Sequence, residues 1–157
     1  MIRRCTLVSV GRLRGWAAEG SEEYAKRLRR YFPVNVIEVA EEDMNRRSRQ
    51  EVLSLEGERI EKRLPTEAYV ISLDRERGKQ HPSAGLARRL EVLGISGRSH
   101  VAFVIGGALG LSPDVLRRSN ELWSFGEITL PHALARVVLL EQLYRAAKIQ
   151  RGEKYHW

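Results

Sequence analysis

The apolar residues of this chain change their spacing repeatedly, from a repeat of about two residues to one of about 3.6, and this constrains the fold most. The shorter repeat is typical of strands and the longer one of amphipathic helices. The pattern predicts strands over residues 2–10, 34–39, 68–73, 101–105 and, more weakly, 122–130. It predicts helices over 16–32, 48–64, 82–93 and 131–150, with another beginning at Ser112-Pro113-Asp114. Such alternation predicts an α/β fold with a mostly parallel sheet flanked by helices.

The chain has the length of one ordinary domain, at 157 residues, and contains no internal repeat, low-complexity segment or linker. We therefore expect a single domain over residues 1–157. No run of about 18 apolar residues is present, and the first residues form a strand pattern instead of a signal core. The only cysteine is Cys5, and no Cys/His cluster has metal-ligand spacing. The sequence thus predicts a cytoplasmic protein with no metal site and no membrane partner.

The net charge is +7 and the isoelectric point is about 10.0. An excess of Lys and Arg favours polyanionic partners such as RNA, because these side chains displace condensed counterions from phosphates. A generic basic protein would have the same excess, so charge alone leaves both interpretations open.

The final predicted helix contains four consecutive apolar residues, Val137-Val138-Leu139-Leu140. Four consecutive helical positions point around the whole axis, so this helix needs cover on every side. One face would pack on the sheet and another on a second copy, which predicts a homodimer through this helix. The alternative is a helix enclosed in the core of a monomer.

Three predicted strand ends are suited to a ligand, because ligands of parallel sheets bind outside the carboxyl ends of the strands. They are Leu73-Asp74, the run Gly106 to Gly110, and Phe125 to Leu130. The glycine spacing is not the dinucleotide fingerprint, and no Gly-Lys-Ser/Thr follows, which excludes a P-loop. Taken alone, a glycine run is also typical of an ordinary strand-to-helix turn.

Histidines and the end of the chain allow two interpretations each. His81 and His132 lie beside prolines near helix starts, where we expect structural or capping roles. The last seven residues, 151–157, combine Arg151 and Lys154 with the rings of Tyr155, His156 and Trp157. This composition suits base stacking and phosphate contact, although chain ends are also commonly frayed.

Several motifs occur together and in order along the chain. They are Val8-Ser9-Val10-Gly11, Tyr24, Leu73-Asp74 with Gly78-Lys79, Phe103-Val104-Ile105-Gly106-Gly107, Leu111-Ser112, Thr129-Leu130-Pro131-His132, the helix from Arg136 to Ala146, and Arg151-Gly152-Glu153 with Tyr155-His156. With these motifs the full length of the chain resembles the bacterial SPOUT-class RNA methyltransferases that modify N3 of a pseudouridine in 23S ribosomal RNA.

The resemblance implies a SPOUT fold whose C-terminal part is threaded as a trefoil knot, a homodimer, and S-adenosylmethionine bound in the knot. It also implies 23S rRNA on the assembled ribosome as the partner. The implied cofactor positions are Leu73, Gly106, Phe125, Gly126, Glu127, Ile128, Thr129 and Leu130. Two departures from the family pattern are Ala108-Leu109, where relatives often have a polar residue, and the terminal Trp157.

A sulfonium methyl donor requires no phosphate-binding loop, but the target nitrogen must be aligned with the methyl group and lose its imide proton. We expect catalytic contributions from His156, Tyr155 and Arg145, and RNA contacts from Arg136, Arg151 and Lys154. Which residue acts as the base, if any, stays open. The alternatives are a SPOUT methyltransferase with a different RNA target, and a non-catalytic ribosome or RNA-binding protein that needs no S-adenosylmethionine.

Overall fold

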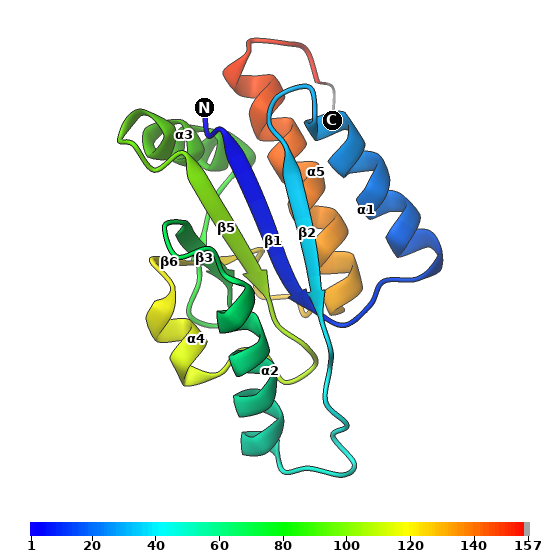
Figure 1. Cartoon of the computed structure of the whole chain (residues 1–157). Helices are drawn as coiled ribbons and strands as arrows, with labels where there is room; N and C mark the ends of the chain where they lie inside the picture. The colour runs from blue at the N-terminus through cyan, green and yellow to red at the C-terminus, as the bar shows by residue number, and fades with distance from the viewer. Residues whose placement is uncertain (156–157) are drawn as a thin grey trace.

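The computed structural model describes residues 1–155, and their strands form one parallel sheet in the order β2-β1-β5-β3-β6-β4 (Figure 1). The strands are β1 (Arg4–Val10), β2 (Val34–Val39), β3 (Tyr69–Leu73), β4 (Lys79–Gln80), β5 (His100–Ile105) and β6 (Glu121–Ser124). The helices are α1 (Gly15–Leu28), α2 (Arg49–Arg63), α3 (Ser83–Ile95), α4 (Pro113–Arg118) and α5 (His132–Gln150). The predicted α/β fold with a parallel sheet is confirmed.

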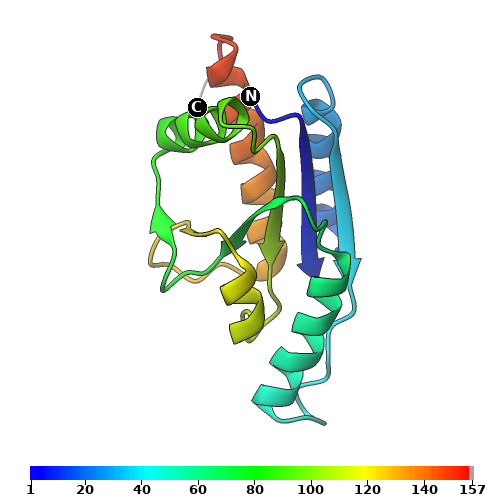
Figure 2. The same ribbon diagram turned by 60° about the vertical axis from the view of Figure 1, so that its left-hand side comes forward.

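The sheet is covered on both faces, which explains why its central strands are apolar throughout (Figures 1 and 2). Leu7 and Phe103 face one core, together with residues of α1, α3 and α5. Val8 and Val104 face the other core, with residues of α2 and α4. The helices therefore divide into a layer of three and a layer of two, and the carboxyl ends of the strands remain open between them.

Two helices begin where the sequence predicts, at serine caps. The Ser48 hydroxyl accepts from the Glu51 backbone N–H at 3.2 Å, which caps α2, and donates to the Glu51 carboxylate at 3.0 Å. The Ser112 hydroxyl accepts from the backbone N–H of Val115 at 3.2 Å at the start of α4. These local bonds satisfy backbone donors that each first turn would otherwise leave free.

Of the structural or capping roles expected for His81 and His132, capping is absent from the described part of the chain and a structural role is present for His81. Pro131 occupies the cap position of α5 and Pro82 that of α3, and neither helix has a side-chain cap bond. His132 lies one position inside its helix and His81 one position before the cap of α3. His81 instead packs edge-on against Trp123, with ring centroids 5.2 Å apart.

The predicted strand over residues 122–130 is also too long, because β6 ends at Ser124 and residues 125–131 form a loop. Gly126 has φ +114°, a left-handed conformation that interrupts an extended strand. In addition, Lys79 and Gln80 pair with β6 as the short strand β4, which is not among the predicted strands.

Within residues 1–155, no helix is both long and apolar enough to cross a membrane. The same part of the chain contains no group of three His, Cys, Asp or Glu side chains arranged to hold a metal ion.

Candidate functional site

A crevice of about 700 Å³ lies at the carboxyl ends of β3, β5 and β6. The segments that follow those three strands line it, and the first turns of α2 and α5 contribute further residues. This is the edge at which parallel sheets bind ligands, and the structure has a crevice where the sequence predicts one.

The first wall is the turn after β3, which Asp74 fixes. Its carboxylate accepts from the backbone N–H groups of Glu76 and Arg77 at 3.0 and 2.9 Å, and from the Arg77 guanidinium at 3.2 Å. A Cβ at Gly78 would collide with the backbone of Trp123, so only glycine lets the turn pass this close to β6. The turn holds Leu73 at the crevice.

The second wall is the glycine loop after β5. The loop closes on itself, because the Gly110 N–H donates to the Gly107 carbonyl at 3.1 Å. A Cβ at Gly106 would collide with the carbonyl group of Gly110, and one at Gly107 would lie 3.0 Å from Oε1 of Glu56. The reversal therefore requires glycine, and it leaves backbone groups facing the crevice.

The third wall is the loop after β6. The Ser124 hydroxyl accepts from the Gly126 N–H at 3.1 Å and lies 3.0 Å from the Arg75 carbonyl, to which it donates. The Arg75 guanidinium donates to the carbonyl of Glu127 at 3.0 Å. These bonds join the third wall to the first, so the two loops form one rim.

The structure brings most of the predicted cofactor positions together in the crevice. Its lining includes Leu73, Gly106, Phe125, Gly126, Ile128, Thr129 and Leu130. Glu127 is absent from the lining, and its carbonyl is occupied by Arg75. A contact from the Glu127 side chain to the cofactor is therefore not supported.

Sequence reasoning missed Arg49, Leu53, His132 and Ala135, which also line the crevice. Arg49 immediately follows a polar loop, where an arginine is usually only solvated. His132 has a buried Nδ1 with no hydrogen-bond partner in residues 1–155. His132 directly follows Thr129-Leu130-Pro131, and this position in the motif could have identified it as a crevice residue.

Arg136 does not contact solvent, so the predicted RNA contact is wrong. Its residue is only 1% exposed, and its guanidinium lies 2.9 Å from Oε2 of Glu38 and donates to the Gly11 carbonyl at 3.1 Å. Burial lowers the pKa of the guanidinium, and Glu38 partly opposes this shift. Arg136 ties the start of α5 to the ends of β1 and β2.

Tyr155 and Arg145 form a cluster around Glu141. The Tyr155 hydroxyl donates to Oε1 of Glu141 at 3.1 Å, the Arg145 guanidinium donates to the same atom at 2.8 Å, and its carbon lies 4.4 Å from the centre of the Tyr155 ring. Burial, followed by the interaction with Glu141, raises the pKa of Tyr155. In this arrangement Tyr155 is a neutral donor and not a base.

The cluster lies farther along α5 than the crevice, centred on Glu141 at the middle of the helix. Ala135 lines the crevice, and the ten residues from there to Arg145 span about 15 Å at 1.5 Å per residue. In Figure 1, α5 begins beside the arrowheads of β1 and β2, and its red end lies at the opposite edge of the sheet. Within the described part of a single chain, neither Tyr155 nor Arg145 lines the crevice.

The remaining predicted residues of the tail are partly defined. The Arg151 guanidinium carbon lies 5.7 Å from the centre of the Tyr31 ring, and Lys154 is exposed. His156 lies outside the described residues.

Comparison with known proteins decides the family. A family model described as "Predicted SPOUT methyltransferase" matches residues 3–156. The chain belongs to the SPOUT methyltransferase family. This SPOUT methyltransferase is 70% identical to the Rubrobacter xylanophilus protein named Ribosomal RNA large subunit methyltransferase H, over all of both chains. A Bifidobacterium adolescentis protein of the same name is 43% identical, covering 98% of this chain and 99% of its own.

One solved structure supports the fold of this SPOUT methyltransferase. It is described as a probable methyltransferase from Bordetella pertussis Tohama I and aligns with a TM-score of 0.55. The alignment covers 93% of this chain and 95% of the other, at 14% identity, so it shows a shared fold alone.

Proposed function

We propose that this SPOUT methyltransferase transfers a methyl group from S-adenosylmethionine to N3 of a pseudouridine in 23S rRNA, on the assembled ribosome. The observation that carries the proposal is the meeting of the predicted cofactor positions in one crevice. The full-length relatives named Ribosomal RNA large subunit methyltransferase H support the RNA target.

The crevice fits the proposed cofactor in size and chemistry. Its volume of about 700 Å³ lies in the range of small-molecule sites. Its lining combines apolar side chains, such as Leu73, Leu111 and Phe125, with backbone groups at Gly106 and Gly126. This mixture suits an adenosine held by stacking and backbone hydrogen bonds. When bound, S-adenosylmethionine supplies an electrophilic methyl group on a cationic sulfur.

The chain's own residues would position the acceptor base and remove its N3 proton. The walls of the crevice exclude water and hold the base in line, which accounts for much of the barrier reduction expected for such a transfer. The residues assigned to the base and to charge stabilisation, His156, Tyr155 and Arg145, belong to the tail and to the far end of α5.

These roles and the proposed homodimer are consistent only if the tail of a second copy reaches the crevice. In the single chain, Leu134, Val137 and Val138 on α5 are only half-buried, so the apolar face of α5 is incompletely covered. A second copy packed on this face would complete its burial. Transfer of Tyr155 away from Glu141 would also remove the interaction that raises its pKa. The same arrangement would present Arg151 and Lys154 to RNA beside the crevice, and the trefoil knot would form its floor.

The test combines labelled S-adenosylmethionine with ribosomes from a strain that lacks the gene. We expect label in the large subunit from whole ribosomes and little from naked 23S rRNA. Isothermal titration should show binding of S-adenosylmethionine by the protein alone. If the protein neither binds S-adenosylmethionine nor transfers label, the non-catalytic ribosome-binding alternative is favoured.

Mixed dimers test the shared site. A Gly106→Val chain should lose its own crevice, and a Tyr155→Phe, His156→Ala chain should lose its own tail. Mixing the two inactive proteins after mild dissociation should restore activity, because one crevice then faces an intact tail. If sedimentation shows that mixed dimers have formed but activity does not recover, the two-chain site is contradicted. A stable monomer at micromolar concentration would refute the dimer itself.

A further inference from the structure

A second cavity of about 470 Å³ lies beside the crevice, between the first turns of α2 and α4. It is lined by Arg49, Gln50, Leu53, Ser54, Ser112, Pro113, Asp114 and Arg117. Arg49, Leu53 and Pro113 line both cavities, so the two spaces are neighbours that share a wall. None of the roles proposed above uses the second cavity.

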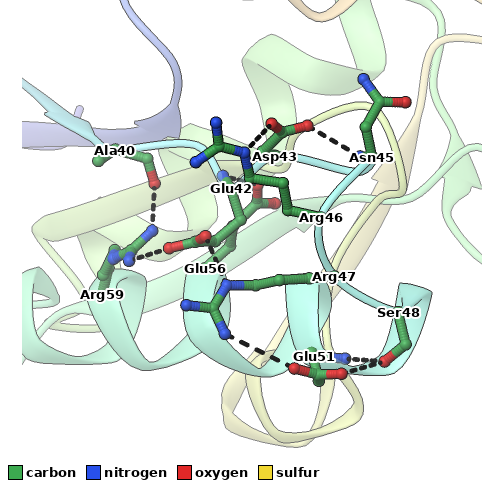
Figure 3. A network of polar contacts seen from close by, with 10 residues as sticks. All are labelled: Ala40, Glu42, Asp43, Asn45, Arg46, Arg47, Ser48, Glu51, Glu56 and Arg59. Carbon is green, nitrogen blue, oxygen red and sulfur yellow. Dashed lines mark hydrogen bonds and ion pairs between the residues drawn. The ribbon is translucent and has the colours of Figure 1, made fainter.

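The arginines around Arg49 already have acidic partners, as Figure 3 shows for those on the loop before α2 and on α2 itself. Arg46 lies 3.4 Å from Asp43, and Arg47 lies 3.0 Å from Glu42 and 3.6 Å from Glu51.

Two further arginines are also neutralised. Arg59 pairs with Glu42 and donates to the Ala40 carbonyl at 3.0 Å, and Arg117 pairs with Asp114 on α4. By contrast, the Arg49 guanidinium has no hydrogen-bond or ion-pair partner anywhere in residues 1–155. Its charge is available to a ligand at the wall between the cavities.

The backbone that carries Arg49 is held in place. The two hydrogen bonds between Ser48 and Glu51 fix the first turn of α2. The loop before the helix is tied down by the buried Glu56, whose carboxylate accepts from the Glu42 N–H at 2.9 Å. A Cβ at Gly57 would collide with the Ser112 hydroxyl, so α2 and α4 approach closely behind the cavity. A ligand at Arg49 would therefore meet a preorganised site, which lowers the cost of ordering.

A phosphate is the ligand that this chemistry favours. The guanidinium forms paired hydrogen bonds with phosphate oxygens, and the proposed acceptor RNA supplies a phosphate on either side of every nucleotide. Ser54 and the amide of Gln50 are exposed on the same wall and can bond to a ribose or a base.

We propose that the second cavity holds the nucleotide next to the target, and that Arg49 binds the phosphate between the two. The inference rests on the proposed function, because it takes the base in the crevice to be part of an RNA strand. It assigns to this chain a positioning site for RNA that adjoins the cofactor crevice and shares the wall at Arg49 with it.

The test compares Arg49→Ala with Arg63→Ala, which removes the same charge from the exposed other end of α2. For Arg49→Ala we expect the KM for ribosomes to rise roughly ten- to hundred-fold, as for loss of a charge-assisted hydrogen bond. The kcat and the Kd for S-adenosylmethionine should stay within about two-fold, and the salt slope of ribosome binding should fall by about one. Arg63→Ala should change none of these. Ser54→Phe, which fills the cavity and keeps the arginine, should also raise the KM.

Three results would overturn the inference while the wild-type enzyme is active. A raised Kd for S-adenosylmethionine with an unchanged KM for ribosomes would assign Arg49 to the cofactor carboxylate. A shift of Arg49→Ala from dimer to monomer would place Arg49 in a subunit interface. Wild-type values throughout would show that the cavity takes no RNA. Absence of methyl transfer by the wild type would instead refute the proposed function. The affinities of Arg49→Ala and Arg63→Ala for ribosomes could then still be compared by filter binding.

Discussion

Replacement of the buried Arg136 by Met should destabilise the fold without a direct effect on RNA binding. The guanidinium lies 2.9 Å from the Glu38 carboxylate and donates to the Gly11 carbonyl at 3.1 Å. Met fills much of the same volume, so the change removes the charge and its hydrogen bonds and leaves only a small cavity.

The size of the effect follows from these contacts. Removing one partner of a buried ion pair costs about 3–5 kcal/mol when the other charge is left without solvent. Here the Glu38 side chain is 34% exposed and still accepts from the Leu13 N–H at 2.8 Å, so the penalty is smaller. We expect a loss of about 2–4 kcal/mol in the free energy of unfolding. For a domain of this size that lowers Tm by roughly 5–15 °C.

The assay is thermal and urea unfolding at one fixed protein concentration, because a dimer makes Tm depend on concentration. Arg88→Met, on the exposed side of α3, is the matched control and should change stability by no more than about 0.5 kcal/mol. A double-mutant cycle with Glu38→Gln should give a coupling energy of about 1–3 kcal/mol. An Arg136→Met protein with unchanged Tm and lost ribosome binding would refute the reasoning, since it would place the guanidinium on RNA.

Three further predictions concern other positions. Burial raises the pKa of Glu56 in the folded protein above its usual 4.5. The stability that the protonated Glu56 contributes should therefore be lost as pH rises from 4.5 through the pKa of the folded state. Glu56→Gln should become more stable relative to wild type over that range, and a difference that does not vary with pH would contradict this. Burial raises the pKa of Cys5 to about 12, so a thiol reagent should label it only as fast as the protein unfolds; rapid labelling of the native protein would count against the buried position. Gly106→Ala should weaken binding of S-adenosylmethionine at least about ten-fold in titration calorimetry, because its Cβ collides with the Gly110 backbone, whereas Gly20→Ala makes only ordinary contact with Val137 and should bind normally. Equal affinities of these two variants would show that the glycine loop is not part of the cofactor site.

Local sequence features predicted what depends on neighbouring residues. The serine cap at Ser112 acts within one helical turn, so the sequence Ser112-Pro113-Asp114 was sufficient to place the start of α4. The crevice was predictable because the ends of parallel strands share one edge, and the motif resemblance then selected the residues at that edge.

Long-range contacts explain the errors. The burial of Arg136 depends on Gly11, 125 residues earlier in the chain, and nothing in the local pattern of α5 distinguishes it from a surface arginine. Residues 125–130 alternate like a strand, but the conformation of Gly126 and the bond from Arg75 to Glu127 shape them into a loop. Arg49 became a candidate only when the partners of the surrounding arginines were known.

The separation between the crevice and the far end of α5 also has no local signature. The sequence placed Arg145 in the motif of the last helix and Tyr155 in the motif of the tail, and the structure shows that the two side chains contact each other. It also centres both on Glu141, six residues or about 9 Å along the helix from Ala135, the nearest crevice residue of α5. The proposed catalytic roles of Arg145 and Tyr155 therefore rest on the proposed assembly of two chains.

The most direct test of the central claim is to map the methylated nucleoside by mass spectrometry, after reaction of the protein with ribosomes from a strain that lacks the gene. The account predicts one additional methyl group, on N3 of a single pseudouridine in 23S rRNA. A methyl group on any other base would contradict the proposed target while leaving the SPOUT fold and the cofactor site in place.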